Sequence, residues 1–297
     1  MTHVATLISN PARPALDAAA IAIAVGVLTT AQDARVLDPG IAADIPFTPS
    51  GADDKAITER LRAALKDKAL DVVVQPAQAR RKRLLVADMD STMIGQECID
   101  ELADYAGLKA HVAAITERAM RGEIAFEPAL RERVALLKGL PLSVVDDVIA
   151  HRITLTPGGR ALVHTMRRNG AHTCLVSGGF TLFTNRVAAM IGFDENRANT
   201  LLADGDKLSG AVAEPILGRE AKLATLVELR LRFGLAVSDT LAIGDGANDL
   251  AMVEAAGLGV AYHAKPKVAE AAQARIDHGD LTALLYAQGY ARADFAR

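Results

Sequence analysis

Four apolar residues at 84–87 run directly into the sequence Asp-Met-Asp-Ser-Thr at 88–92. A short apolar run of this kind is typical of a buried strand. In an open α/β sheet, ligands bind beyond the carboxyl ends of the strands, so Asp88 and Asp90 are expected at such an edge. Side chains two residues apart along a strand lie on one face, which lets both carboxylates meet a common ligand. An ordinary turn can begin with the same residues, and the motif alone leaves the two interpretations about equal.

These two aspartates suit chemistry on a phosphate group through a metal ion. Carboxylates are hard oxygen ligands of the kind that Mg²⁺ prefers. An aspartate can also act as a nucleophile and become an aspartyl-phosphate. A second carboxyl group nearby can move a proton to or from the leaving oxygen. Other motifs in the chain decide between this chemistry and a plain turn.

The composition favours a globular protein with a sizeable core. The chain has 297 residues, of which 51% are hydrophobic and 23% charged, so two or three ordered domains are expected. The formal net charge is −3 at pH 7, aromatic residues make up 4% and tryptophan is absent, which argues against a nucleic-acid partner. We interpret the basic cluster at 80–83 as a solvated linker before the strand at 84–87.

The sequence predicts neither a membrane anchor nor disulfide bonds. The apolar run at 18–28 is too short to span a bilayer, and we predict a buried helix there. Asp17 directly before it and the lack of a basic leading region argue against a signal peptide. Cys98 and Cys174 fit neither a disulfide framework nor a metal-binding Cys-x-x-Cys site. Reduced thiols in a cytoplasmic protein, without a membrane partner, are the expectation.

Residues 1–76 are predicted to form a small separate unit. Apolar patterns indicate the order strand, helix, two strands, helix, strand, at about 3–8, 14–28, 34–48, 53–68 and 70–74. This order resembles a ferredoxin-like or ACT-type regulatory fold. Amino-acid sensing or formation of a homodimer through this unit is one interpretation. A packing module without a ligand is an equally good one.

The region 94–156 is predicted to form a bundle of four short helices. The second helix is expected at about 110–121, with Gly122 at its end. Arg133 lies on the apolar stripe of the third helix, where an unpaired charge is costly, and its guanidinium group suits a carboxylate. Glu97 is a candidate for binding an ammonium group. An internal salt bridge for Arg133 and a helix-dipole role for Glu97 are equally good explanations.

From residue 157 the sequence returns to alternating strands and helices. An apolar strand leads into Ser-Gly-Gly at 177–179, where a hydroxyl group and backbone N–H groups suit an anion. Lys222 lies near the start of a helix, where a cation opposes the helix dipole, and a strong anion facing it would explain this position. A solvent-exposed lysine is the alternative. Another strand leads into Gly-Asp-Gly-Ala-Asn-Asp at 244–249. The elements predicted here are helices at 158–169, 218–233, 265–274 and 281–288, strands at 172–176, 240–243 and 258–261, and a hairpin at 199–212.

Each of these signals is weak alone, but together they resemble the haloacid dehalogenase (HAD) superfamily of phosphohydrolases. The four motifs of that superfamily occur here in order as Asp-x-Asp, Ser, Lys and Gly-Asp-x-x-x-Asp, over about 77–297. The positions of Glu97 and Arg133, and the sequence Val-Ser-Gly-Gly-Phe at 176–180, resemble its phosphoserine-hydrolysing members. The resemblance implies a Mg²⁺-dependent hydrolase that converts O-phospho-L-serine to serine and phosphate, the last step of serine biosynthesis. Action on another small phosphomonoester, or phosphotransfer on the same core, is the alternative.

The resemblance also implies a fold class and a division into domains. The expected fold is α/β, with a Rossmann-like parallel-sheet core at 77–93 and 157–297. A helical-bundle cap is expected at 94–156. The unit at 1–76 would be an additional α+β domain of the ferredoxin/ACT-like kind.

The roles of the matching residues follow from the resemblance too. Asp88 would be the nucleophile, and Asp90 the general acid and base. The protein ligands of Mg²⁺ would be the carboxylates of Asp88 and Asp245 and the backbone carbonyl of Asp90. Glu97 would bind the substrate ammonium group and Arg133 its carboxylate. The groups around the phosphate would be those of Ser177, Gly178, Lys222 and Asn248, with Asp249 as a support of the metal shell.

Other classes of protein fit less well. A P-loop nucleotidase needs G-x-x-x-x-G-K-[ST], which the sequence lacks. A dinucleotide-binding oxidoreductase needs G-x-G-x-x-G, and the segment 244–249 ends in Asp instead. A non-catalytic amino-acid sensor would leave the core carboxylates unexplained.

Carboxylates around a phosphate also require a cation, because two like unit charges about 4 Å apart repel by roughly 4 kcal/mol at an effective dielectric constant near 20.

Overall fold

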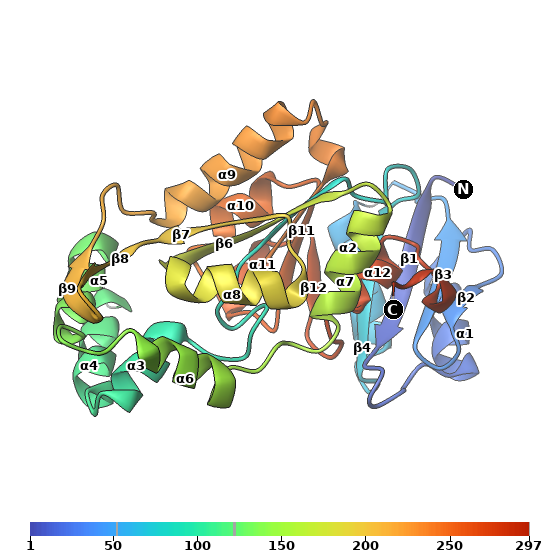
Figure 1. The fold of residues 1–297 in the computed structure, drawn as a ribbon. Helices are drawn as coiled ribbons and strands as arrows, with labels where there is room; N and C mark the ends of the chain where they lie inside the picture. Colours follow the sequence, from blue (N-terminus) through green and yellow to red (C-terminus); the bar gives the residue numbers. More distant parts are fainter. Residues whose placement is uncertain (52, 121–122, 297) are drawn as a thin grey trace.

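The computed structural model describes residues 1–51, 53–120 and 123–296. Its centre is a six-stranded parallel sheet with the order β12-β11-β10-β5-β6-β7 (Figure 1). The strands are β5 (Leu84–Ala87), β6 (His172–Phe180), β7 (Glu195–Asn199), β10 (Thr240–Gly244), β11 (Leu258–Tyr262) and β12 (Ala274–Ile276). The predicted α/β class with a parallel sheet is confirmed. The sequence analysis identified the three central strands and β11, and it missed the two edge strands β7 and β12.

Helices cover both faces of this sheet, which explains why its central strands are apolar throughout. In β5, Leu84 and Val86 pack towards α9 (Arg219–Arg232) and α10 (Leu250–Ala255). Leu85 and Ala87 point to the other face, with α7 (Gly159–Arg168) and α8 (Thr181–Ile191). This alternation follows from the two-residue period of a strand. The remaining helices of the core are α11 (Pro266–Ala271) and α12 (Ala283–Ala287).

The N-terminal segment forms its own antiparallel sheet with the order β2-β3-β1-β4. Its elements are β1 (His3–Ser9), α1 (Ala18–Val27), β2 (Arg35–Asp38), β3 (Ala42–Phe47), α2 (Asp54–Ala64) and β4 (Leu70–Pro76). Asp17 and Asp53 begin the two helices by accepting hydrogen bonds from the N–H groups of Ala20 and Ala56. The predicted α+β order is confirmed. One face of the sheet packs on α1 and α2, and the other packs on the core near α12 (Figure 1).

Two predictions for this part of the chain were wrong, the first of them in part. In the cluster at 80–83, Arg81 and Arg83 are exposed as expected, but Arg80 forms a two-pronged ion pair with Asp44 at 2.8 and 2.9 Å. Lys82 is also buried, and its ammonium group donates to the carbonyl oxygens of Ala79 and Ser238. Burial lowers the pKa of Lys82 to about 8. The linker therefore fixes the N-terminal sheet to the core through desolvated cations that bond to specific oxygens.

The helix α1 is also not buried, contrary to prediction. Ala20 and Ala24 are its buried residues, whereas Ile23 is 41% exposed. The reason is that a helix lying on one face of a small sheet must present its opposite side to solvent, whatever its composition. No helix among the described residues is long and apolar enough to cross a membrane.

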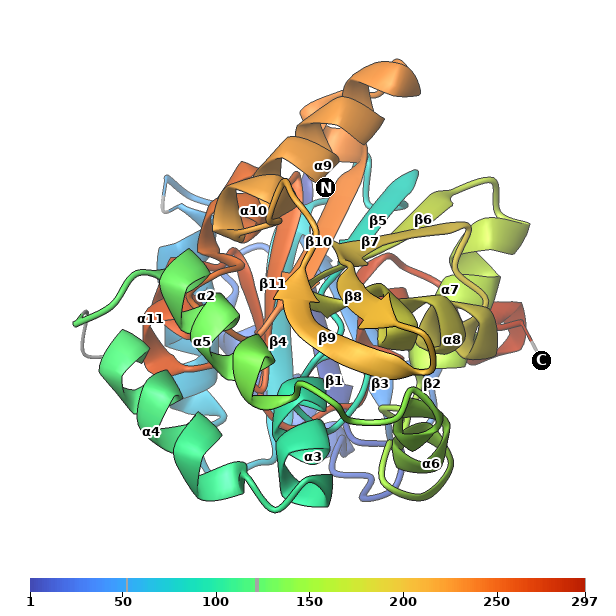
Figure 2. The same ribbon diagram turned by 60° about the vertical axis from the view of Figure 1, so that its left-hand side comes forward.

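Between β5 and α7, the residues that the structure describes form four helices, which lie to one side of the core (Figures 1 and 2). They are α3 (Cys98–Tyr105), α4 (Lys109–Met120), α5 (Phe126–Leu136) and α6 (Ser143–His151). The predicted end of the second helix at 121–122 lies outside the described residues. The two connections to the core run side by side, since Gly95 N–H donates to the Thr154 carbonyl and Thr156 N–H to that of Met93. We call residues 94–156 the cap, and its boundaries stay a prediction.

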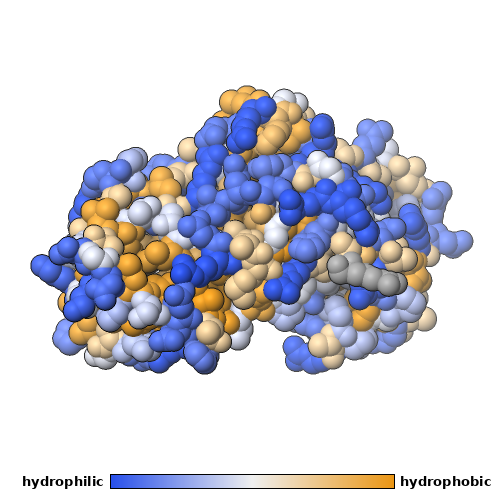
Figure 3. Space-filling view, in the orientation of Figure 1, coloured by the Kyte–Doolittle hydropathy of each residue, from blue (hydrophilic) through white to orange (hydrophobic). Residues whose placement is uncertain are grey.

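The predicted hairpin is present as β8 (Leu201–Asp204) and β9 (Lys207–Val212). It extends from the end of β7 and lies against α5 of the cap (Figure 2). Backbone hydrogen bonds join the two, from Gly139 N–H to the Leu208 carbonyl and from Leu208 N–H to the Leu140 carbonyl. In Figure 3, apolar side chains gather on the surface over this cap-and-hairpin side and at the outer end of α9. Through its backbone bonds to the hairpin, the cap has a third attachment to the core. The prediction of an all-helical insertion did not include this attachment.

Candidate active site

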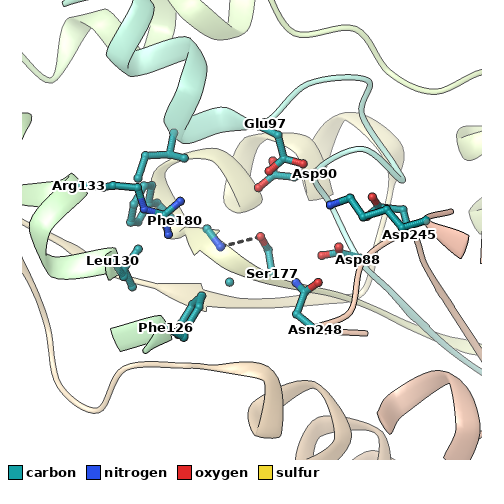
Figure 4. Close-up of a pocket in the computed structure, with 15 residues that line it drawn as sticks. Asp88, Asp90, Glu97, Phe126, Leu130, Arg133, Ser177, Phe180, Asp245 and Asn248 are labelled. Atoms are coloured by element: carbon teal, nitrogen blue, oxygen red, sulfur yellow. Dashed lines mark hydrogen bonds between the residues drawn. The ribbon is translucent and has the colours of Figure 1, made fainter. Parts of the chain in front are cut away.

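The residues singled out from the sequence converge on one pocket between the core and the cap (Figure 4). The parallel register pairs Ala87 of β5 with Ile243 of β10 and Leu175 of β6, so the carboxyl ends of these three strands meet at one edge. The predicted residues that line the pocket are Asp88, Asp90, Glu97, Arg133, Ser177, Gly178, Asp245 and Asn248. Lys222 and Asp249 lie buried directly beside Asp88.

Asp88 is held in a buried turn at the end of β5. The N–H group of Met89 donates to its Oδ1 at 2.8 Å, and the ammonium group of Lys222 lies 2.6 Å from the same oxygen. The turn closes through N–H donation from Met93 to the Met89 carbonyl, with Ser91 in the left-handed region at φ 54°. Burial, and next the charge of Asp249, raise the pKa of Asp88 well above its usual value, while Lys222 opposes this shift. The negative form of Asp88 thus depends on cations placed beside it.

Lys222 lies near the start of α9 and is almost fully buried, with 2% of its side chain exposed. Its Nζ lies 2.5 Å from Asp249 Oδ1 as well as 2.6 Å from Asp88. Burial lowers the pKa of Lys222, but the charges of Asp88 and Asp249 outweigh this and raise the pKa above its ordinary value. The alternative of a solvent-exposed lysine is excluded. Lys222 instead faces anions, as its position at a helix start suggested.

Asp249 is fully buried, and both of its carboxylate oxygens accept hydrogen bonds. Oδ1 accepts from Lys222, and Oδ2 accepts from the N–H groups of Gly246 at 3.0 Å and Asp245 at 3.2 Å. A Cβ atom at Gly244 would lie 2.3 Å from Asp249 Cγ, so only glycine admits this approach. Asp249 therefore stabilises the 244–249 turn by binding its backbone N–H groups.

The donor set beside this turn is suitable for a divalent cation. Carboxylate oxygens of Asp88, Asp245 and Asp249 lie within 4.8 Å of one another. Hard oxygen donors of this kind match Mg²⁺, which takes ligands at about 2.0–2.1 Å. Burial, and next the charge of Asp249, raise the pKa of Asp245 to about 6. Since both oxygens of Asp249 are already engaged, Asp88 and Asp245 have the more available carboxylates for an ion.

Asp90 has a pKa close to neutrality. Burial and the charge of Glu97 raise it to about 7, against the hydrogen bond that Asp90 Oδ1 accepts from Cys98 N–H at 3.4 Å. A group with this pKa can both donate and accept a proton near pH 7. Glu97 precedes α3, and its Oε1 accepts from the Ser91 hydroxyl at 2.7 Å instead of capping the helix. Its carboxylate lies next to Asp90 in the pocket (Figure 4).

Ser177 and the two glycines after it form a tight turn at the end of β6. Ser177 Oγ accepts a hydrogen bond from Gly179 N–H at 2.8 Å, which leaves its own proton for another acceptor. A Cβ atom at Gly179 would lie 3.0 Å from Ser177 Oγ and 3.1 Å from Asp90 Oδ2. A side chain at residue 179 would therefore press on both groups, and glycine leaves the Ser177 hydroxyl and the Asp90 carboxylate in place.

Arg133 points from α5 of the cap into the pocket (Figure 4). Its Nε donates to the Ala129 carbonyl at 3.2 Å and its Nη1 to Thr116 Oγ1 at 3.4 Å. Within residues 1–51, 53–120 and 123–296, no carboxylate lies within ion-pair distance of its guanidinium group. Burial lowers the pKa of Arg133, and the charges of Asp100 and Glu97 oppose this shift. The internal salt bridge considered for Arg133 is absent from the part of the chain that the structure describes.

Sequence reasoning missed several residues of the pocket. Phe126, Leu130 and Phe180 give it an apolar wall, and Lys265 adds a cation at its rim. The apolar residues carry no signal beyond that of ordinary core positions. Lys265 has no signal in the sequence either. It reaches the pocket through the fold, in which its N–H group donates to the Asp245 carbonyl at 3.0 Å.

A pocket of carboxylates and one buried lysine, at the carboxyl edge of a parallel sheet, defines a class of hydrolases. Residues 85–254 match the haloacid dehalogenase-like hydrolase family, and the chain belongs to it. A solved structure of a HAD family hydrolase from Salmonella enterica serovar Typhi has a TM-score of 0.85 with 29% sequence identity. The alignment covers 98% of this chain and 99% of that one.

Curated relatives within the family are phosphoserine phosphatases. The chain is 44% identical to the phosphoserine phosphatase of Streptomyces coelicolor over 256 residues, which are 84% of this chain and 61% of the relative. It is 47% identical to the phosphoserine phosphatase of a Polaromonas species over 208 residues, which are 68% of this chain and 88% of the relative. The chain thus spans less than two thirds of the Streptomyces protein and most of the Polaromonas one.

Proposed function

We propose that the protein is a phosphoserine phosphatase that hydrolyses O-phospho-L-serine to serine and phosphate. The observation that carries this proposal is the arrangement of charges in the pocket. Asp88 and Asp90 suit attack on a phosphoryl group and proton transfer to its leaving oxygen, and Ser177 and Lys222 suit binding of its oxygens. Glu97 and Arg133 extend from the cap side and suit an ammonium group and a carboxylate. A phosphorylated amino acid carries these three groups on one small skeleton.

In this proposal the cap recognises the amino-acid part of the substrate. The guanidinium group of Arg133 has donors arranged as a fork that matches a carboxylate. Its lack of an ion-pair partner among the described residues leaves that fork available to a ligand. Glu97 would accept from the substrate ammonium group. Phosphoserine and phosphothreonine differ by one methyl group. If this methyl group meets the apolar wall formed by Phe126 and Leu130, discrimination between the two substrates is limited to roughly 1–3 kcal/mol.

The hydrolysis would proceed in two displacements on Asp88. Asp88 attacks phosphorus and forms an aspartyl-phosphate, while Asp90 gives its proton to the departing serine oxygen. Asp90, now negative, then takes a proton from water, which attacks the aspartyl-phosphate and restores Asp88. Ser177, the N–H group of Gly178, Lys222 and Asn248 would hold the phosphoryl oxygens. The pKa of about 7 at Asp90 suits both proton transfers.

Mg²⁺ fits the donor set of Asp88 and Asp245, and Asp249 would hold the turn that carries Asp245. When bound, it would offset the repulsion between the phosphate and the surrounding carboxylates. The backbone carbonyl of Asp90 is the third protein ligand in this proposal. The N-terminal α+β unit would be an ACT-like module, and a homodimer formed through it stays a prediction.

The proposal is tested by measuring phosphate release with Mg²⁺ and with a chelator. L-phosphoserine should be hydrolysed faster than phosphothreonine and much faster than sugar phosphates, and the chelator should abolish the activity. Arg133→Ala should raise KM for phosphoserine by roughly tenfold or more, the loss expected for a charge-assisted hydrogen bond. Arg131→Ala is the matched control, because Arg131 lies in the same helix and forms an exposed ion pair with Glu214. Equal rates on sugar phosphates, or an unchanged KM in Arg133→Ala, would overturn the assignment of phosphoserine.

A further inference from the structure

We infer that Asn199 is a positioning residue that fixes the two segments around the phosphate, the turn at 177–179 and the start of α9, relative to each other. The inference rests on the proposed phosphatase function, because it assigns a purpose to groups that would bind phosphoryl oxygens. Asn199 does not line the pocket, and no motif in the sequence singled it out.

The side-chain amide of Asn199 bonds to three backbone groups in two separate segments. Its Nδ2 donates to the carbonyl oxygen of Gly178 at 2.9 Å and to that of Leu217 at 3.1 Å. Its Oδ1 accepts from the N–H group of Leu217 at 2.7 Å. Only 2% of Asn199 is exposed, so water does not compete for these bonds. Both amide protons and the amide oxygen are used, and an apolar replacement would leave three backbone groups without their partner.

Each of the two segments leads directly to a group that would bind phosphate. Gly178 follows Ser177, and its own N–H group is one of the proposed donors. Leu217 precedes Gly218, the residue before α9, and Lys222 lies near the start of that helix. The Asn199 side chain therefore sets the distance between the Ser177 turn and the helix that carries the buried ammonium group.

Strand pairing alone does not fix the 177–179 turn. β6 pairs with β7 through Val176 and again through Phe180, with a shift in register between them. The residues in the gap are those that face the pocket. Asn199 is the partner of Phe180 in this pairing, and its side chain supplies the bond to Gly178 that the regular ladder lacks. A side chain in this place is a structural substitute for a missing backbone hydrogen bond.

Asn199 is the last residue of β7, and the hairpin β8–β9 follows it in the chain. Figure 2 shows the hairpin extending from the end of β7. The adjacent bond, from Ala213 N–H to the Thr200 carbonyl, closes the base of the hairpin. At its far end the hairpin is bonded to the cap, with Leu142 N–H donating to the Asp206 carbonyl. The phosphate-binding segments and the cap-bound hairpin therefore meet at Asn199.

The inference is tested by the affinity for inorganic phosphate, measured by calorimetry in Mg²⁺ on the 297-residue chain. Asn199→Leu keeps the branched shape and the number of heavy atoms of the side chain and removes all three bonds, and Asn199→Ala is the second variant, which adds no bulk. We expect the dissociation constant for phosphate to rise roughly ten- to a hundredfold, since small misplacements of binding groups have effects of this size. The dissociation constant for L-serine, which would use Glu97 and Arg133, should change less than about twofold.

Asn196→Ala is the matched control. Asn196 lies in the same strand, and its Oδ1 accepts from the Thr184 hydroxyl at 2.6 Å, away from the pocket. This variant should bind phosphate as the unmodified protein does. Equal weakening in Asn196→Ala and the Asn199 variants would mean a general loss of structure and would overturn the inference.

A double-mutant cycle with Ser177→Ala separates positioning from simple destabilisation. If Asn199 acts through the Ser177 turn, the two substitutions will have non-additive effects on phosphate affinity. Additive effects, or unchanged phosphate affinity in a folded Asn199 variant, would overturn the inference. Failure of the proposed function would be seen separately, as absence of phosphoserine hydrolysis by the unmodified protein.

Discussion

The ammonium group of Lys222 lies 2.6 Å from the carboxylate of Asp88, with 2% and 6% of the two side chains exposed. Asp249 holds the other side of the same ammonium group at 2.5 Å. One cation between two carboxylates leaves an excess of negative charge in a buried place. This charge balance explains why the site suits a divalent cation and why Lys222 cannot be replaced by a neutral residue without cost.

Lys222→Ala is expected to lower the free energy of unfolding by roughly 3–5 kcal/mol, because it leaves two buried carboxylates without their partner. It should also abolish phosphate release. Urea unfolding at pH 7 in a chelator measures the first effect. Lys265→Ala is the control, since Lys265 is an exposed lysine at the rim of the pocket and should change stability by about 0.5 kcal/mol or less. A Lys222→Ala protein as stable as the control would contradict the charge balance described above.

The pH dependence of kcat/KM should report the pKa of Asp90. Its pKa of about 7 means that the free enzyme carries a protonated Asp90 below pH 7 and loses that proton above it. Since the first displacement needs the proton, kcat/KM should fall as the pH rises through about 7. Glu97→Gln removes a charge that raises this pKa and should move the falling limb to lower pH. A limb that stays at the same pH in Glu97→Gln would show that another group controls it.

Asp90 should also affect stability, with a sign that follows from its raised pKa. The folded state holds the proton more tightly than the unfolded state, whose Asp pKa is near 3.8. The contribution of this bound proton to the free energy of unfolding is complete below pH 3.8 and is lost as the pH rises through about 7. Asp90→Asn should therefore unfold at a higher urea concentration than the unmodified protein at pH 8, and the difference should shrink at pH 4. The opposite order at pH 8 would mean that Asp90 is stabilised as an anion.

Gly179→Ala is expected to lower activity by roughly tenfold or more with a smaller effect on stability. Its Cβ atom would lie 3.0 Å from Ser177 Oγ and 3.1 Å from Asp90 Oδ2, so one or both groups must move. Gly26→Ala is the control, because nothing lies within 4 Å of a Cβ atom there and alanine favours the helix α1 by about 1 kcal/mol. Steady-state kinetics and thermal unfolding of both variants test this. Normal kinetics in Gly179→Ala would contradict the expectation that a Cβ atom at this position displaces Ser177 or Asp90.

The fold was predictable where its elements have a clear apolar pattern. The central strands β5, β6 and β10 are buried between two layers of helices and are therefore apolar along their length. The edge strand β7 has the polar sequence Glu-Asn-Arg-Ala-Asn, and β12 has three residues, so neither has a pattern that could be recognised. The burial of Arg80 and Lys82 was also hidden, because it depends on oxygens of Asp44 and Ser238 that are distant in sequence.

The candidate site was predictable to a greater extent because its groups follow directly on apolar strands. Asp88, Ser177 and Asp245 each lie where a parallel strand ends, and parallel strands end at the same edge. Asn199 could not be found in this way. Its partners are backbone groups of Gly178 and Leu217, which have no signature in the sequence. Residues that hold a site in shape through the backbone are visible only in the folded structure.

The identity of the nucleophile is the central claim of the mechanism, and mass spectrometry of the rapidly quenched enzyme tests it directly. The account predicts that phosphoserine with Mg²⁺ leaves one phosphoryl group on Asp88, within a peptide that spans 88–92. Asp88→Asn should carry no phosphoryl group and show no turnover. A phosphoryl group on any other residue, or full turnover by Asp88→Asn, would contradict the account.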